Sequence, residues 1–187
     1  MRFAIFLQNY FPYGGLQRDA VRLAEAALEA GDEPTLVVST WNGPKLSTFP
    51  IQELKSGGCN NHTKASRFDQ DCAKILDSKT FDTAICFSRV PGSPFHFCGD
   101  PCLLEKFTQS KPALARYLPR YRYLLETEEK LFGAKSATHI FYLAASEIPA
   151  YKKHYPLLQN QYTLLPPWLK SPESYDQRSS IIKRELC

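Results

Sequence analysis

The first thirty residues constrain the fold of this chain more than any other stretch. Residues 2–7 read Arg-Phe-Ala-Ile-Phe-Leu, a nearly continuous apolar run that is typical of a parallel strand buried on both faces. The turn 10–15 follows, and apolar residues then recur at helical spacing until Gly31, a residue type that commonly ends a helix. The apolar positions of this helix are Leu16, Ala20, Leu23, Ala24 and Ala27. A strand, a glycine turn and a helix in this order open a nucleotide-type α/β domain.

The turn contains two adjacent glycines, Gly14 and Gly15, which suit a phosphate ligand. Glycines let the backbone come close to a ligand, and the free N–H groups at the start of a helix favour an anionic group. Neither the dinucleotide fingerprint G-x-G-x-x-G nor the P-loop pattern is present, however. On the pattern alone, an ordinary tight turn remains an equally good interpretation.

In the rest of the chain, apolar runs typical of strands alternate with stretches of helical spacing. Further strands are expected at residues 35–39, 49–54, 82–87, 138–143 and 161–165. Helices are expected at 64–77, in two pieces from residue 103 that are separated around 110–112, with a kink or break of the second piece at Pro119, and from 146. This alternation predicts an α/β fold with a Rossmann-like, doubly wound parallel sheet. Because parallel strands end at the same edge, the turn 9–15 and the loop 88–101 should share one ligand-binding rim.

Composition narrows the class of protein further. The chain has 187 residues and 43% hydrophobic content, which is typical of a globular domain, and no apolar run approaches the length of a membrane span. Its six cysteines lack paired spacing, which favours reduced thiols over a metal site. Asp69 and Asp71 resemble a metal-binding D-x-D, but residues two apart on a helix point in different directions. No metal site is therefore predicted.

The rim loop 88–101 contains three candidates for chemistry, Arg89, His96 and Asp100. A carboxylate at Asp100 could orient or deprotonate an acceptor hydroxyl, but Asp100 could equally cap the helix that follows. His96 lies between two phenylalanines, so a packed histidine is the alternative to a cleft residue.

The net charge of +4 is concentrated in one window, residues 103–124, which has five cations and one carboxylate. The cations are Lys106, Lys111, Arg116, Arg120 and Arg122. They alternate with tyrosines and leucines, a pattern that suits an anionic membrane surface. The alternative is a solvated helix whose aromatic residues face the core. Nucleic acid is not expected, because no binding motif for it is present.

Several of these stretches occur together in one known family. The string Tyr-Phe-Pro-Tyr-Gly-Gly-Leu-Gln-Arg-Asp at 10–19 is the most distinctive of them. It is joined by Pro91-Gly92, Asp100 with Cys102-x-x-Glu105-Lys106, Arg120-Tyr121-Arg122, Lys153-His154-Tyr155 and Leu165-Pro166-Pro167. Nearly end to end, the sequence resembles the N-terminal half of the lipopolysaccharide core glucosyltransferase I family, retaining enzymes of glycosyltransferase family 4.

The resemblance implies the GT-B fold, two Rossmann-like domains with the active site between them, and a reaction that needs no metal. The donor would be a nucleotide sugar, UDP-glucose, and the acceptor a heptose of the lipid-linked inner core. Gly14 and Gly15 would meet the donor diphosphate and Asp19 would lie beside them. Asp100 would be catalytic. From the position of the rim loop, we also expect Arg89 and His96, together with Asp19, to line the acceptor cleft. Residues 103–132 would dock on the inner face of the cytoplasmic membrane, which makes the protein cytoplasmic and peripheral.

The sequence also departs from the family. Residues 1–170 would form the acceptor-side domain and 171–187 a linker or the start of the donor-binding domain, so the chain alone is expected to be inactive. Trp168 stands where the family usually has glycine after Pro-Pro. Pro94 and His96 replace family residues near Asp100, so the resemblance does not define the specificity for the acceptor. The rival hypothesis is a non-catalytic module, truncated or half of a split enzyme, that binds anionic membrane or an acceptor glycan. Self-association, or pairing with a separate C-terminal half, is a further expectation.

Overall fold

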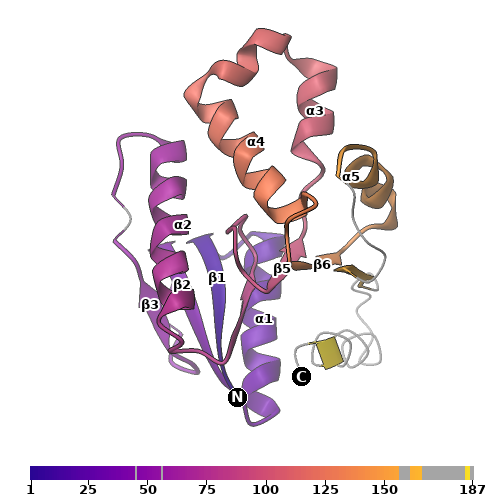
Figure 1. Ribbon diagram of the computed structural model, residues 1–187. Coiled ribbons are helices and arrows are strands. Elements are labelled where there is room, and N and C mark those ends of the chain that lie inside the picture. Colours follow the sequence, from indigo (N-terminus) through magenta and orange to yellow (C-terminus); the bar gives the residue numbers. More distant parts are fainter. Residues whose placement is uncertain (45, 56, 156–160, 166–183, 186–187) are drawn as a thin grey trace.

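The computed structural model describes residues 1–44, 46–55, 57–155, 161–165 and 184–185. These residues form a parallel sheet with the strand order β3-β2-β1-β4-β5-β6-β7 (Figure 1). The strands are β1 (Arg2–Tyr10), β2 (Glu33–Trp41), β3 (Ile51–Glu53), β4 (Thr83–Cys86), β5 (Phe95–Cys98), β6 (His139–Tyr142) and β7 (Tyr162–Leu164). The helices are α1 (Gly15–Glu29), α2 (Asn61–Asp77), α3 (Leu103–Ser110), α4 (Pro119–Phe132) and α5 (Ile148–His154), with 3-10 turns η1 (Ala113–Tyr117) and η2 (Ala145–Glu147). The predicted Rossmann-like α/β fold is confirmed.

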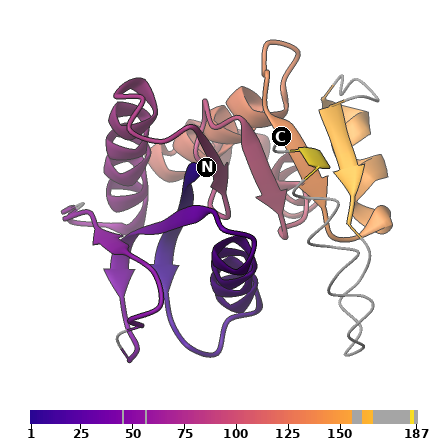
Figure 2. The same cartoon turned by 90° about the horizontal axis from the view of Figure 1, so that it is seen from below.

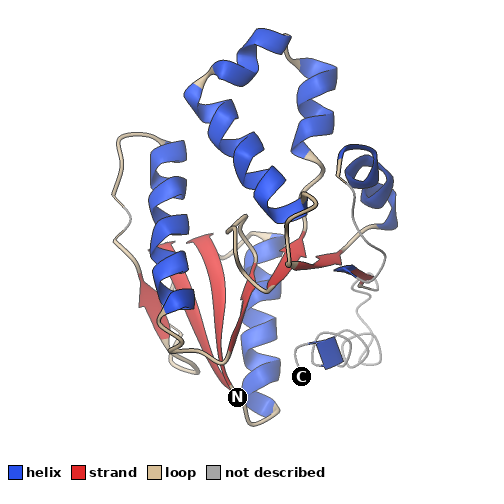
Figure 3. Ribbon diagram, in the orientation of Figure 1, coloured by secondary structure: helices blue, strands red, loops and turns tan. Residues whose placement is uncertain are grey.

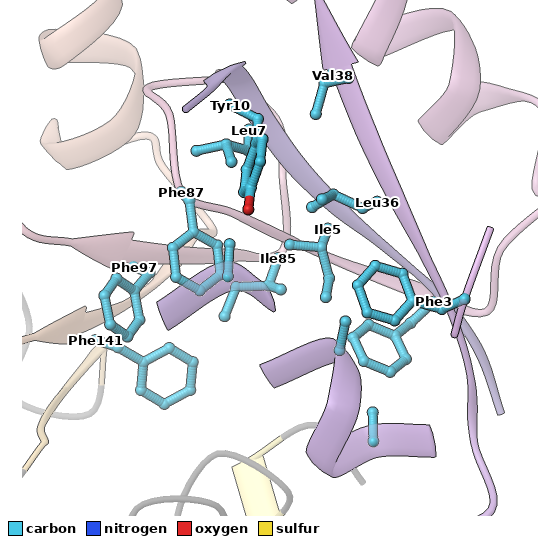
Figure 4. Close-up of a cluster of buried hydrophobic side chains, with 14 of the residues drawn as sticks. Phe3, Ile5, Leu7, Tyr10, Leu36, Val38, Ile85, Phe87, Phe97 and Phe141 are labelled. Carbon is cyan, nitrogen blue, oxygen red and sulfur yellow. The ribbon is translucent and has the colours of Figure 1, made fainter. Parts of the chain in front are cut away.

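Helices cover both faces of the sheet, which explains the continuous apolar run at its centre. Figure 2 shows α1 on one side of the sheet and α2 on the other. In β1, Phe3, Ile5 and Leu7 belong to the core on the α1 side (Figure 4), whereas Ala4 and Phe6 pack on the α2 side. Residues 3–7 of this strand have no solvent face, so each of these positions must be apolar.

A third cluster extends the α2 side of the sheet toward β6. Phe132 of α4 stacks on Tyr151 of α5, with ring centroids 4.3 Å apart, over Ile140 and Tyr142 of β6. Helices α4 and α5 are therefore held to the sheet by large buried rings. This packing fixes the C-terminal end of α4, the helix that carries part of the basic window.

The strand β5 was missed by the sequence analysis, which expected a loop over residues 88–101. It pairs with β4 through Ile85 and Phe95, and with β6 along all four of its residues. It is short, it contains His96, and it follows Gly92 and Pro94, which are typical of turns. The rim residues Gly99 and Asp100 therefore follow a strand of their own.

Two helix boundaries also differ from expectation. Helix α2 begins at Asn61, three residues early, because the Asn60 side chain accepts a hydrogen bond from the Thr63 backbone N–H at 3.0 Å. Pro119 begins α4 instead of breaking a helix, since the first helical position needs no N–H donor. The predicted domain boundary after residue 170, and the tail beyond it, lie outside the described residues.

Helices α3 and α4, joined through η1, project beyond the carboxyl ends of the strands (Figure 3). We call residues 103–132 the helical hairpin. Its two arms pack through Phe107 and Tyr121, whose ring centroids are 5.4 Å apart. The hairpin thus carries the basic window away from the sheet on the side where ligands bind.

Candidate functional site

The glycine turn and Asp100 lie on the same rim of the sheet, as predicted. Gly99 follows β5 and faces Leu16, in the first turn of α1. A Cβ atom placed on Gly99 would lie 3.2 Å from the Leu16 Cδ1 atom and 3.3 Å from that of Leu143. This close approach joins the start of α1, the end of β5 and the end of β6 at one point.

The two glycines of the turn have different surroundings. A Cβ atom on Gly14 would lie 1.7 Å from Oε1 of Gln17, a buried side chain whose Nε2 donates to the Asn9 carbonyl at 3.1 Å. A Cβ atom on Gly15 would meet no atom of the described residues within 4 Å. Gly14 therefore makes room for Gln17, and Gly15 is the one that faces open space at the start of α1.

Asp100 has an exposed side chain on a fixed backbone. Its carbonyl oxygen accepts a hydrogen bond from the Tyr151 hydroxyl at 3.1 Å. The alternative role as a helix cap does not apply, because α3 begins at Leu103 after Cys102. The carboxylate of Asp100 is thus presented at the rim by a buried tyrosine, in a position where a hydroxyl could reach it.

The N-terminus of α3 is instead capped from α4 by Glu128, a residue that the sequence analysis missed. The Glu128 carboxylate is fully buried and accepts from the backbone N–H groups of Leu103 and Leu104 at 2.8 and 2.9 Å. It also accepts from the Tyr155 hydroxyl at 2.9 Å. In the sequence it lies among charged residues of α4 and looks like part of a solvent face, so no local signal marked it.

Arg89 completes this network behind the rim. Its Nη2 atom lies 3.4 Å from Glu128 Oε2 and donates to the Pro101 carbonyl at 3.1 Å. Burial alone would lower the pKa of Arg89, but Tyr151 and the Glu128 and Asp100 carboxylates together raise it above its ordinary value. Arg89 therefore lies close to Asp100, as expected for a cleft residue, while its contacts in the described structure are internal.

His96 is a packed histidine and does not face the rim. It is 3% exposed on β5, its Nδ1 lies 3.1 Å from the Cys86 carbonyl, and its ring meets Phe132 edge-on. Burial, with a further contribution from Arg89, lowers its pKa to about 3, so the ring is neutral and Nδ1 donates the hydrogen bond. Its placement in the acceptor cleft was wrong, because pairing between β5 and β4 turns the ring inward.

Asp19 lies on α1 one turn after Gly15, beside the glycine turn as expected. Its Oδ1 atom is 4.0 Å from Nη1 of Arg22. Its role toward a ligand remains a prediction.

The helical hairpin has aromatic residues that pack inside the protein and also an exposed surface of apolar and basic side chains, so both interpretations of the basic window apply to parts of it. Its inner aromatic residues are structural: Phe107 is buried, and the Tyr123 hydroxyl donates to Asp69 on α2. Its tip is exposed and apolar, with Leu114, Tyr117 and Leu118 being 78%, 66% and 54% exposed. The five cations are exposed as well, namely Lys106, Lys111, Arg116, Arg120 and Arg122.

The carboxylates of the D-x-D pattern point apart, as predicted. Asp69 is hydrogen-bonded to Tyr123, while Asp71 pairs with Lys74 at 2.8 Å. Within the described ranges, no three potential metal ligands gather, and Cys59, Cys72, Cys86, Cys98 and Cys102 are free thiols. No helix in that part of the chain is both long enough and apolar enough to cross a membrane.

A doubly wound parallel sheet with an uncovered glycine, a helix N-terminus and a carboxylate on one rim defines a Rossmann-like ligand-binding domain. Comparison with known proteins identifies the group to which it is similar. Over 175 residues the chain is 28% identical to lipopolysaccharide glucosyltransferase WaaG of Escherichia coli (strain K12), covering 94% of this chain and 47% of WaaG. It therefore spans about half the length of this curated relative.

The solved structures agree with this similarity. The crystal structure of WaaG, described as a glycosyltransferase involved in lipopolysaccharide biosynthesis, matches with a TM-score of 0.85 at 28% identity, over 91% of this chain and 46% of that one. Sucrose-phosphate synthase from Thermosynechococcus elongatus matches with a TM-score of 0.60 over 88% of this chain and 47% of its own, but at 12% identity this likeness concerns the fold alone. No family model matches the sequence. The resemblance to the N-terminal half of a GT-B lipopolysaccharide glucosyltransferase is confirmed.

Proposed function

We propose that this chain is the acceptor-side half of a glycosyltransferase of lipopolysaccharide core synthesis. The observation that carries the proposal is the joint likeness to WaaG, in sequence and in structure, over more than nine-tenths of the chain. We further propose the reaction of the resembled family, transfer of glucose from UDP-glucose to a heptose of the inner core with retention. The rival hypothesis of a non-catalytic module has no comparable support.

The rim supplies two of the groups that such a transfer requires. Gly15 and the N-terminus of α1 would face the donor diphosphate, where backbone N–H groups stabilise the charge that develops on the leaving group. Asp100, held through its backbone by Tyr151, would orient or deprotonate the acceptor hydroxyl. The resemblance implies a nucleotide-sugar donor and no metal.

The resemblance implies that transfer also needs groups of a donor-binding half, which this chain does not match. The 187 residues correspond to less than half of WaaG, so we expect them to show little or no transfer when tested on their own. The decisive experiment therefore joins this chain to the half of WaaG that it does not cover, and measures transfer from labelled UDP-glucose to heptose-terminated lipopolysaccharide core.

The expected result is glucose transfer by the chimera, reduced at least ~100-fold by Asp100→Asn, because a general base contributes ~10²–10⁴-fold. The matched control is Asp77→Asn, which removes an exposed carboxylate at the C-terminal end of α2 and should leave transfer unchanged. A chimera that melts cooperatively yet transfers no sugar would refute the proposed function.

We also propose that the helical hairpin docks on an anionic membrane surface. Support comes from its exposed apolar tip and from the five exposed cations along the hairpin. The apolar side chains would enter the headgroup region, while each basic residue near an anionic surface adds about 1 kcal/mol. This placement would present the rim to a lipid-linked acceptor at the inner face of the cytoplasmic membrane.

Vesicle sedimentation tests the docking. We expect binding to vesicles that contain anionic lipid and little binding to neutral ones. Neutralising the five cations to glutamine should weaken binding strongly, and Leu114→Ser should weaken it further. Lys135→Gln, an exposed lysine outside the hairpin, serves as the control. Binding that survives neutralisation of all five cations would contradict electrostatic docking.

A further inference from the structure

A pocket lies at the carboxyl edge of the sheet, between the ends of β1 and β2 and the start of α2. Its volume is about 630 Å³. The residues that line it are Gln8, Asn9, Ser39, Thr40, Lys55, Gly57, Asn61 and Lys64. Neither the glycine turn nor Asp100 belongs to this lining, so the proposed function leaves the pocket unexplained.

The pocket is positively charged and contains no acidic group among its lining residues. Lys55 follows β3 and Lys64 lies in the first turn of α2, so the two cations reach the pocket from different elements. None of the ion pairs among the described residues involves either lysine. The N-terminal end of α2, a helix of 17 residues, adds partial positive charge from its backbone dipoles. An anionic group placed here would therefore face two lysines that have no competing carboxylate.

The chain around these lysines is held in place by specific contacts. Arg67 Nη1 donates to the Gly57 carbonyl at 2.6 Å, which ties Gly57 to α2. A Cβ atom on Gly58 would lie 2.7 Å from Thr63 Oγ1 and 3.0 Å from Lys64 Cγ, so the loop packs tightly on the stem of Lys64. The residues beside Lys55 are thus held against the part of α2 that carries Lys64.

The floor of the pocket is polar and connects to the glycine turn. Thr40 Oγ1 donates to Asn9 Oδ1 at 2.8 Å, which fixes the Asn9 side chain at the end of β1. The backbone carbonyl of Asn9 accepts a hydrogen bond from the side chain of Gln17, which packs against Gly14. Amides and hydroxyls beside the two cations are the groups that bind sugar hydroxyls next to an anionic substituent.

We propose that this pocket binds the anionic substituent, a phosphate or a carboxylate, of an acidic sugar in the acceptor. The identity of that molecule as acceptor rests on the proposed function, whereas the anion site rests on the pocket itself. An acceptor anchored here by its charge would extend along the rim past the glycine turn toward Asp100. The site would select acidic acceptor sugars over neutral ones.

The test is titration of the 187-residue chain, followed by backbone amide NMR shifts. The probes are glucose 6-phosphate, glucuronic acid, neutral glucose and UDP-glucose. We expect the two acidic sugars to shift amides of Asn9, Thr40 and Gly57, and glucose not to shift them. Lys55→Gln and Lys64→Gln should each weaken binding about fivefold, the effect of one unit charge at ~4 Å in water. Lys135→Gln should leave it unchanged.

The outcomes separate the possibilities. Shifts with only one acidic sugar support the site and identify its group as phosphate or carboxylate. No lysine-dependent shift with either acidic sugar overturns the proposal, as does a shift of these amides by UDP-glucose alone. Because this measurement needs no transfer, a chimera that fails to transfer glucose would refute the proposed function while leaving the anion site intact. Transfer without acidic-sugar binding would refute the anion site alone.

Discussion

Replacing Glu128 by glutamine should lower the free energy of unfolding far more than any substitution on the surface of α4. The carboxylate is fully buried, accepts two backbone N–H bonds from α3 and one from Tyr155, and lies 3.4 Å from a guanidinium nitrogen of Arg89. Glutamine has similar volume but replaces one acceptor oxygen by an NH₂ donor. At least one buried N–H therefore loses its acceptor, and the mostly buried Arg89 loses its counter-charge.

The size of the effect follows from these contacts. An unsatisfied buried donor costs roughly 1–3 kcal/mol, and removing one partner of a buried ion pair costs about 3–5 kcal/mol in total. We expect Glu128→Gln to lower the free energy of unfolding by about 3–4 kcal/mol, which lowers Tm by roughly 6–16 °C in a domain of this size. Urea denaturation followed by circular dichroism measures the first quantity, and a thermal scan measures the second.

The control is Glu126→Gln, two residues earlier on the same helix. Glu126 forms an exposed pair with Arg122 at 2.8 Å, and such a pair contributes about 0.3–0.5 kcal/mol. A loss below about 1 kcal/mol for Glu128→Gln, or an equal loss for both variants, would refute the assignment of Glu128 as the buried link between α3, α4 and the rim.

Two further predictions concern titration and the glycine turn. Burial raises the pKa of Asp69 from 3.8 to about 7, against the opposing hydrogen bond from Tyr123. Between these values the folded carboxyl keeps a proton that the unfolded one has lost, so its contribution to stability falls as pH rises, by at most about 4 kcal/mol. Asp69→Asn should therefore gain stability relative to the wild type from pH 4 to pH 7 in urea denaturation. A stability difference between the two proteins that does not change with pH would contradict this. Gly14→Ala should destabilise the fold by about 1–3 kcal/mol, since its Cβ would collide with Gln17. Gly15→Ala should be neutral or stabilising by up to about 1 kcal/mol in the same assay. Equal losses at both positions would contradict the conclusion that a Cβ is crowded at position 14 and free at position 15.

The architecture was predictable because its strongest signal is local. The apolar run of β1, its turn and the helix ended by Gly31 can be read directly from periodicity, and Gly31 does adopt a positive φ of 83°. Parallel pairing then places the glycine turn and Asp100 on one rim. The direction of the strands alone sets this arrangement, so it can be predicted without knowing any side-chain partner.

The parts that escaped prediction depend on contacts between distant residues. Glu128 caps a helix that begins 25 residues earlier in the chain, and nothing in its neighbourhood distinguishes it from the charged residues beside it. His96 was ambiguous because its inward orientation is set by strand pairing with Cys86. The pocket containing Lys55 and Lys64 combines the ends of β1 and β2, the loop after β3 and the start of α2, and the segment before α2 looked only like a loop.

The close contact between Gly14 and Gln17 has a consequence for how this turn can vary. The side chain at position 17 occupies the space into which any Cβ at position 14 would extend, so a side chain at position 14 requires the one at position 17 to change or shift. A larger residue at position 14 requires a small one at position 17, and the carbonyl of Asn9 must then find a different donor. Relatives of this chain should therefore show correlated substitution at these two sites, while the neighbouring position 15 varies only as its ligand permits.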